Sequence, residues 1–324
     1  MEMDQQRLGN TDVQVSALCY GTDLIGSRVD ETQSHTLLDL FADHGGTFID
    51  TGNFYASWYP GCVGGESEST IGRWMAARGN RARMVLSTKL GFDYPGCEGG
   101  LSASEIESEC NKSLQRLQTD CIDVYYAHRD DFETPVEETM EAFHRLVTAG
   151  KVRILGASNL WLWRVAEANM LAALQGFTQY SVVEQRYTYL RPRHGADFGP
   201  QICITDDMKR FCTHHNISLI AYSILLQGAY SRDDRPVPAQ FAGPEADERL
   251  AALQSVASET GSTVNQVIIA WMRQSDPPVL PIIGGSKEEQ VLENLAALDL
   301  KLSEAQMEHL TDAGNPDVKK AWLR

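Results

Sequence analysis

Short apolar stretches alternate with amphipathic stretches along almost the whole chain. The apolar stretches have the length of buried strands, and the amphipathic stretches repeat apolar residues at helical spacing. The pattern predicts strands at 16–21, 47–50, 84–88, 121–127, 152–157, 177–182, 218–223 and 279–283. It predicts helices at 31–43, 66–78, 102–117, 134–149, 160–174, 206–215 and 287–297, with two more at 246–260 and 263–273 before the last strand.

This order of elements predicts an α/β protein with the (β/α)8 TIM-barrel architecture. Strands that alternate with helices form parallel sheets, and eight such units in a row favour a closed barrel over an open sheet. Gly9, Asn10 and Thr11 lie between two short runs and predict an N-terminal β-hairpin. No shift in composition marks a boundary, so we expect one domain over residues 1–324 with extra helices towards the C-terminus. The irregular segments 91–100, 187–200 and 225–244 follow strands, which in a barrel places them on the catalytic face.

Composition and charge narrow the classes of partner. The net charge of −16 argues against nucleic acid and against anionic membrane surfaces. The N-terminus lacks the pattern of a signal peptide, and no apolar run is long enough for a membrane span, so a cytoplasmic location is expected. The seven cysteines include no CxxC pair, which predicts reduced thiols and no metal site.

The ends of the predicted strands carry polar residues that suit one reaction. Asp50, Lys89 and His128 end three successive strands, and Tyr55 follows five residues after Asp50. A carbonyl carbon that receives hydride leaves an oxygen that needs a proton, which Tyr55 can donate. We expect a nearby Lys89 ammonium to lower the pKa of Tyr55, with Asp50 holding Lys89 in place. His128 would donate a hydrogen bond to the carbonyl oxygen.

Four segments carry a resemblance to the aldo-keto reductase family. They are TFIDTGNFY (47–55), STKLG (87–91), SLQRLQTDCIDVYYAHRDD (113–131) and GKVRILGASN (150–159). The segments occur in the family's order, and the resemblance extends from about residue 8 to residue 302. It implies that Asp50, Tyr55, Lys89 and His128 form a catalytic tetrad. The implied reaction is hydride transfer between NADP(H) and an aldehyde, ketone or alcohol.

The resemblance also implies a cofactor site. Ser158, Asn159 and Gln179 would hold the nicotinamide carboxamide, and Tyr222 would stack on the ring. Ser223, Leu225 and Gly228 would line the pyrophosphate, and the same site would include Gly21, Thr22, Asp50 and Gly284. The segment IIGGSKEEQVLENL (282–295) would bind the adenosine part of the cofactor. Its Ser286, Lys287 and Gln290 would contact the 2′-phosphate, and its Glu293 and Asn294 would contact the adenine.

One departure bears on the choice of cofactor. Many relatives carry arginine where Gln290 stands, and Glu288 and Glu289 would weaken the field of Lys287 at a phosphate. NADP(H) nevertheless remains the expected cofactor, with NAD(H) as the alternative. The GxGxxG fingerprint of a Rossmann site does not occur in the sequence.

The substrate and the competing functions are less constrained. Trp58, Arg129 and Trp161 are candidate contacts for a small molecule, and aromatic residues beside carboxylates suit a sugar-like substrate. An oligomer is left open. One alternative is a barrel glycoside hydrolase with Asp50 and Glu184 as its carboxylate pair, although that leaves Lys89 without a role. Another is a nicotinamide-binding regulatory subunit with little turnover.

Overall fold

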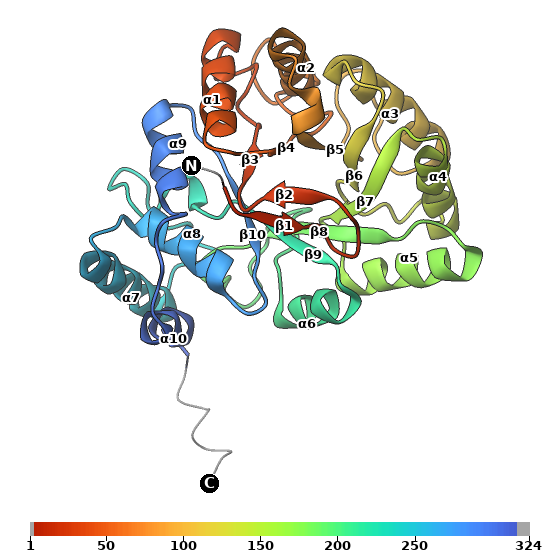
Figure 1. The fold of residues 1–324 in the computed structure, drawn as a ribbon. Helices are drawn as coiled ribbons and strands as arrows, with labels where there is room; N and C mark the ends of the chain where they lie inside the picture. The colour runs from red at the N-terminus through yellow and green to blue at the C-terminus, as the bar shows by residue number, and fades with distance from the viewer. Residues whose placement is uncertain (1–2, 316–324) are drawn as a thin grey trace.

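The computed structural model describes residues 3–315 and contains a closed barrel of parallel strands. Figure 1 shows helices surrounding the barrel. The strand order around the barrel is β10-β3-β4-β5-β6-β7-β8-β9. In chain order these strands are β3 Cys19–Gly21, β4 Phe48–Asp50, β5 Val85–Leu90, β6 Ile122–Ala127, β7 Val152–Ser158, β8 Tyr180–Arg186, β9 Ser218–Tyr222 and β10 Leu280–Ile283. The predicted (β/α)8 fold is confirmed.

The helices match the predicted amphipathic stretches closely. They are α1 Glu31–Asp43, α2 Glu66–Arg78, α3 Ala103–Leu117, α4 Val136–Thr148, α5 Leu162–Gln175, α6 Asp206–His215, α7 Pro244–Thr260, α8 Val264–Gln274, α9 Glu288–Ala296 and α10 Glu304–Asp312. Two short 3-10 helices, η1 Arg81–Arg83 and η2 Leu226–Gly228, lie in loops. None of the helices in residues 3–315 combines the length and apolarity that crossing a bilayer would require.

The predicted N-terminal hairpin closes one end of the barrel. Strands β1 Gln5–Arg7 and β2 Gln14–Ser16 pair antiparallel, and Figure 1 shows them lying across the barrel opening. Leu8, Val13 and Val15 of this hairpin are buried in the same apolar cluster as side chains inside the barrel, such as Phe48 and Tyr126. Because the hairpin fills the end at which the barrel strands begin, the end at which they finish is left for a site.

Strand β8 and helix α10 show the largest differences from the prediction. Strand β8 is Tyr180–Arg186, shifted towards the C-terminus from the expected 177–182. The Asn169 side chain explains where it begins, because its amide bonds both the N–H and the carbonyl of Tyr180. Extra helices were expected towards the C-terminus, but no bounds were predicted for α10, which Ser303 and Gln306 start with a reciprocal capping box.

Candidate active site

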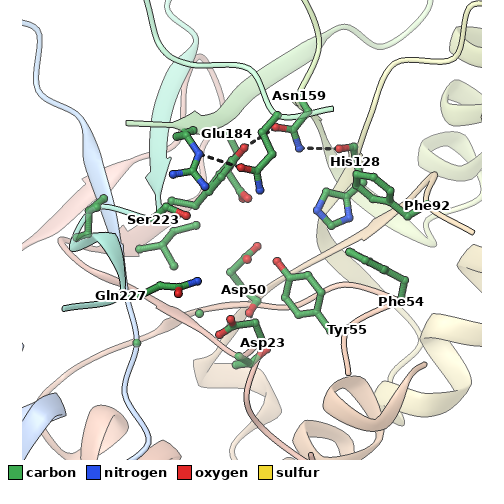
Figure 2. Close-up of a pocket in the computed structure, with 18 of the residues that line it drawn as sticks. Asp23, Asp50, Phe54, Tyr55, Phe92, His128, Asn159, Glu184, Ser223 and Gln227 are labelled. Atoms are coloured by element: carbon green, nitrogen blue, oxygen red, sulfur yellow. Dashed lines mark hydrogen bonds between the residues drawn. The ribbon is translucent and has the colours of Figure 1, made fainter. Parts of the chain in front are cut away.

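The strand-end residues meet at a cavity of about 710 Å³ at the C-terminal end of the barrel. Asp50 ends β4, Lys89 lies in β5, His128 directly follows β6, and Glu184 lies in β8. Figure 2 shows Asp50, Tyr55, His128 and Glu184 facing this cavity. Parallel neighbouring strands present their carboxyl ends at the same edge, so residues 39 apart in the sequence, such as Asp50 and Lys89, become neighbours.

Lys89 is the centre of the site. Its ammonium is fully buried, contacts the Asp50 carboxylate, and donates to the Thr51 carbonyl (2.9 Å) and the Tyr55 hydroxyl (3.2 Å). Burial alone would lower the pKa of Lys89, but the negative charge of Asp50, joined by that of Glu184 when this carboxyl group is ionised, raises it well above its usual value. Lys89 is therefore a fixed positive charge. Asp50 is itself fixed, since its other oxygen accepts a hydrogen bond from Ser87 (2.6 Å).

The pKa of Tyr55 moves in the direction opposite to the sequence-based expectation. Lys89 does lower it, but burial is the larger cause, and the charge of Asp50 acts in the same direction as burial, as does that of Glu184 when it is ionised. The net result is a Tyr55 pKa well above its usual value. In the protein alone, Tyr55 is a protonated phenol that can donate and is not a phenolate.

His128 is a neutral hydrogen-bonding group. Its pKa is held well below the usual value by burial and by the positive charges of Lys89 and Arg129. Its Nδ1 atom has no partner among the described residues. The backbone of His128 is fixed by bonds from its N–H to Leu90 and from Asn159 to its carbonyl. A neutral imidazole beside the Tyr55 ring can donate one hydrogen bond to a carbonyl oxygen.

Glu184 also belongs to this site, although the sequence analysis had considered it only as one carboxylate of a glycoside hydrolase. Its side chain is nearly fully buried, and one oxygen lies 3.5 Å from Lys89 Nζ. The other oxygen has no partner among the described residues. Burial and the Asp50 charge raise the pKa of Glu184 to about 8. Because Asp50 and Glu184 share one ammonium, they do not stand as two independent carboxylates on either side of a glycosidic bond.

Aromatic rings form the wall beside Tyr55 and His128. Phe54 stacks on Phe92 with ring centres 4.7 Å apart, and both rings meet the His128 ring edge-on. Trp58 packs against Phe54 at 5.1 Å and Tyr55 at 5.9 Å, and it lines the cavity while 49% of its surface stays exposed. This wall offers planar apolar surface next to the proton donor.

Two of the proposed substrate residues do not line the cavity. The Arg129 guanidinium lies 3.8 Å from Asp93 and covers the Phe92 ring, and Trp161 is half exposed at the start of α5. The neighbouring carboxylates also have structural partners, since Asp130 pairs with Arg164 and Asp131 accepts a bond from Leu101 N–H. The residues expected to bind sugar hydroxyls are therefore engaged elsewhere.

The amide side chains near the cavity tie strand ends together. Asn159 donates to the His128 carbonyl (2.9 Å) and accepts from the Tyr222 hydroxyl (2.6 Å). Gln185 accepts from the Asn159 N–H (2.8 Å) and donates to the Leu160 carbonyl. Ser158 is buried, and its hydroxyl accepts a bond from the Asn159 amide (3.2 Å).

The expectation for Gln179 is wrong. Gln179 precedes β8, so it lies at the end of the barrel that the hairpin closes, where it is exposed and bonds to the Asn169 carbonyl. The glutamine at the catalytic end of the strand is Gln185. Continuing the alternation of Tyr180, Val182 and Glu184 would have carried the predicted strand far enough to find it.

The ends of β9, β10 and β3 form the second half of the cavity. This half is lined by six of the residues that the sequence analysis assigned to the cofactor: Tyr222, Ser223, Leu225, Gly21, Thr22 and Gly284. Gly21 sits so close to β10 that a Cβ atom there would come within 2.7 Å of the Ile282 side chain. Gly228 is not among the lining residues, but it completes a left-handed turn (φ 93°) that holds Gln227 over the cavity (Figure 2).

The segment after β10 extends beyond this cavity. Lys287 is exposed at the start of α9, and Ser286 N–H bonds to the Gln290 side chain (2.9 Å), which shapes the turn. Asn294 is buried and donates to the Gly284 carbonyl, while Glu293 accepts from Thr263 (2.7 Å). In this structure, therefore, the side chains of Glu293 and Asn294 form hydrogen bonds within the protein.

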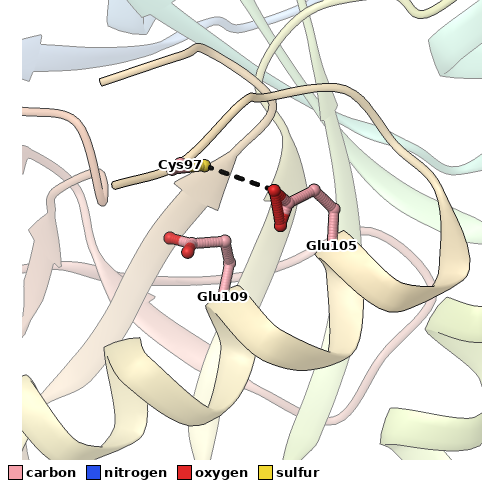
Figure 3. Close-up of side chains that lie close together, drawn as sticks. All are labelled: Cys97, Glu105 and Glu109. Atoms are coloured by element: carbon pink, nitrogen blue, oxygen red, sulfur yellow. Dashed lines mark hydrogen bonds between the residues drawn. The ribbon is translucent and has the colours of Figure 1, made fainter. Parts of the chain in front are cut away.

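A separate cluster beside the site brings together Cys97, Glu105 and Glu109 (Figure 3). Glu109 already accepts hydrogen bonds from Asn53 (2.7 Å), Tyr94 (2.6 Å) and Lys112 (2.6 Å). Burial raises the pKa of Cys97 to about 11, so it is a thiol at neutral pH. We interpret the cluster as an anchor. It fastens the segment before Tyr55 and the 91–100 loop to α3.

Comparisons with known proteins agree with this geometry. The sequence model of the Aldo/keto reductase family matches residues 17–315. The chain belongs to the aldo/keto reductase family. It is 33% identical to a norsolorinic acid reductase of Aspergillus flavus, over 94% of this chain and 79% of that protein. It is 34% identical to the aldo-keto reductase ausK of Emericella nidulans, over 94% and 78%. It is also 33% identical to an aryl-alcohol dehydrogenase [NADP(+)] of Phanerodontia chrysosporium, over 88% and 76%.

Proposed function

We propose that this aldo-keto reductase transfers hydride between NADP(H) and an aromatic aldehyde, ketone or alcohol, with Tyr55 as the general acid or base. The observation that carries the proposal is the contact of the buried Lys89 ammonium with both Asp50 and the Tyr55 hydroxyl (3.2 Å), two residues that line a cavity walled by aromatic rings. The aromatic wall favours an aryl substrate over the sugar-like one. The name of the aryl-alcohol dehydrogenase points the same way.

The residues present fit a nicotinamide dinucleotide. Tyr222 offers an aromatic face, the turn with Gln227 covers the cavity, and Glu184 keeps a buried oxygen without a partner that can bond to an amide. Asn159, Gln185 and Ser158 would hold the carboxamide side, and Ser286 and Lys287 would meet a 2′-phosphate. When bound, the nicotinamide supplies or accepts the hydride.

Side chains of this protein would then orient the substrate oxygen and transfer its proton. In carbonyl reduction, Tyr55 gives its proton to the substrate oxygen, and neutral His128 orients that oxygen by a hydrogen bond. The fixed charge of Lys89 stabilises the phenolate that remains, because a positive charge 3.2 Å away favours the ionised oxygen. In alcohol oxidation, the same phenolate removes the proton. Phe54, Trp58 and Phe92 hold the aryl group and exclude water.

The test is turnover by Tyr55→Phe in an NADPH-oxidation assay with benzaldehyde and acetophenone derivatives. Loss of the proton donor is expected to lower kcat by at least about 100-fold. The NADPH dissociation constant should stay within about twofold of wild type, because Phe keeps the ring in place. Tyr59→Phe, in the same loop, serves as the matched control and should keep its rate. A Tyr55→Phe rate close to wild type would overturn the assignment, and absence of aryl turnover in the wild type would overturn the substrate class.

A further inference from the structure

We propose that Arg186 forms a carboxylate-binding subsite at the mouth of the cavity, so that the preferred substrates are aryl carbonyl compounds carrying an acidic group. This inference rests on the proposed function and extends it to the charge of the substrate. It starts from the position of one arginine that the catalytic chemistry does not use.

Arg186 stands one layer above the catalytic lysine. It is the last residue of β8, two residues after Glu184, so both side chains belong to the same face of the strand. Both residues line the catalytic cavity, and Glu184 is the one that reaches Lys89. Two residues of a strand span about 7 Å, roughly the length of a para-substituted benzene ring. An aryl carbonyl bound at Tyr55 can therefore place a distal substituent at the level of Arg186.

The guanidinium of Arg186 is held in one orientation. Its Nε donates to the Gln201 side chain (2.9 Å), and its central carbon lies over the rings of Phe198 (5.1 Å) and Tyr222 (5.9 Å). The backbone beside it is also fixed, since the Arg186 N–H bonds to the Ile202 carbonyl (3.0 Å). These side-chain contacts use Nε and the central carbon of the group. The two terminal nitrogens, which form the fork that binds a carboxylate, have no partner within residues 3–315.

Charge in the cavity singles out this residue. Arg186 is the only lysine or arginine among the lining residues, and in the described part of the chain no carboxylate lies within 4.0 Å of its guanidinium. Other half-buried arginines are paired, as Arg116 is with Glu68 and Arg164 with Asp130. A cation that is oriented and partly desolvated but unpaired favours an anionic ligand. Glu184, in the layer beneath, is neutral below about pH 8 and does not repel such a ligand.

The cofactor's pyrophosphate is the other source of anionic oxygens. We favour a substrate carboxylate because Arg186 is held by Phe198 and Gln201, from the 187–200 loop and the residue after it. The residues expected at the pyrophosphate, Ser223 and Leu225, follow β9 instead. The two sources predict different results when the charge of Arg186 is removed.

The experiment compares 4-carboxybenzaldehyde with its methyl ester, which has the same aldehyde without the charge. Wild type is expected to show kcat/KM at least tenfold higher for the acid, the size of one charge-assisted hydrogen-bonded pair. Arg186→Met should abolish this preference and leave the ester's kcat/KM within about twofold. Arg193→Met, an exposed arginine in the same loop, is the matched control and should keep the preference.

Two further readouts separate the possible failures. Equal losses for both substrates in Arg186→Met, with a raised NADPH dissociation constant, would assign Arg186 to the cofactor and overturn the subsite. Equal wild-type activity on acid and ester would also overturn it while leaving the proposed function intact.

Calorimetric binding of benzoate tests the subsite without turnover. Benzoate binding that is lost in Arg186→Met, in a protein that reduces no aldehyde, would support the subsite and sink the proposed function. Absence of benzoate binding by a wild-type protein that reduces aldehydes would overturn the subsite and leave the proposed function intact.

Discussion

Replacing Glu184 with glutamine should remove an unusual contribution to the pH dependence of stability. In the folded protein the pKa of Glu184 is raised from 4.5 to about 8, chiefly by burial. Between these values the folded state holds a proton that the unfolded state has released, so the free energy of unfolding falls as pH rises. The slope is about 1.4 kcal/mol per pH unit. The sign is opposite to that of a salt-bridged carboxylate, whose stabilisation is lost as pH falls.

The magnitude is measurable as a difference in melting temperature. From pH 5.5 to 7.5 the contribution is about 3 kcal/mol, which for a chain of 324 residues corresponds to roughly 4 °C. Glutamine does not titrate, so the melting temperature of Glu184→Gln minus that of wild type should rise by about 4 °C over this range, measured by circular dichroism. Other titrating groups cancel in the difference. Glu308→Gln, on the exposed face of α10, should track wild type. A difference that stays flat or falls with pH would show that Glu184 is ionised and paired with Lys89, and would refute the reasoning.

Two other substitutions test the cofactor preference and the packing of the outer helices. Lys287→Ala should raise the dissociation constant of NADPH about tenfold and leave that of NADH nearly unchanged, since only NADPH carries the 2′-phosphate. Both constants can be measured by fluorescence titration. Equal losses of affinity for the two cofactors would show that Lys287 does not bind the phosphate. Gly72→Ala should lower the melting temperature by about 3 °C, although alanine normally favours a helix, because its Cβ would come within 2.2 Å of the Arg116 carbonyl oxygen. Ala76→Gly, on the exposed face of the same helix, should lower the free energy of unfolding by only about 1 kcal/mol. A melting temperature of Gly72→Ala above that of wild type would contradict the packing argument.

The fold could be predicted from the sequence because every unit repeats the same local signals. The bounds expected for α2 and α6 agree with the structure residue for residue, since Gly79 ends α2 and Thr205 caps α6. The prediction failed where an irregular segment meets an apolar strand. Phe177 extends the apolar run before β8, and only the bonds of Asn169 to Tyr180 show where the strand begins.

The candidate site divides in the same way. Asp50, Tyr55, Lys89 and His128 lie together as predicted, because their positions follow from strand order alone. The error at Gln179 follows from the misplaced strand. The direction of the Tyr55 pKa could not be predicted, since it depends on burial and on Glu184, a residue 129 positions away that reaches Lys89 from another strand. Such distances depend on tertiary structure and leave no local pattern.

The contact between Lys89 and Glu184 has a consequence for how the site is assembled. The two residues come from β5 and β8, which are separated by β6 and β7, so their contact requires this part of the sheet to be curved. A fragment ending before β8 would retain the ammonium, its aspartate and the tyrosine, but would lack the carboxyl group across the lumen. The complete arrangement of carboxyl groups around Lys89 is thus formed only after β8 has joined the sheet.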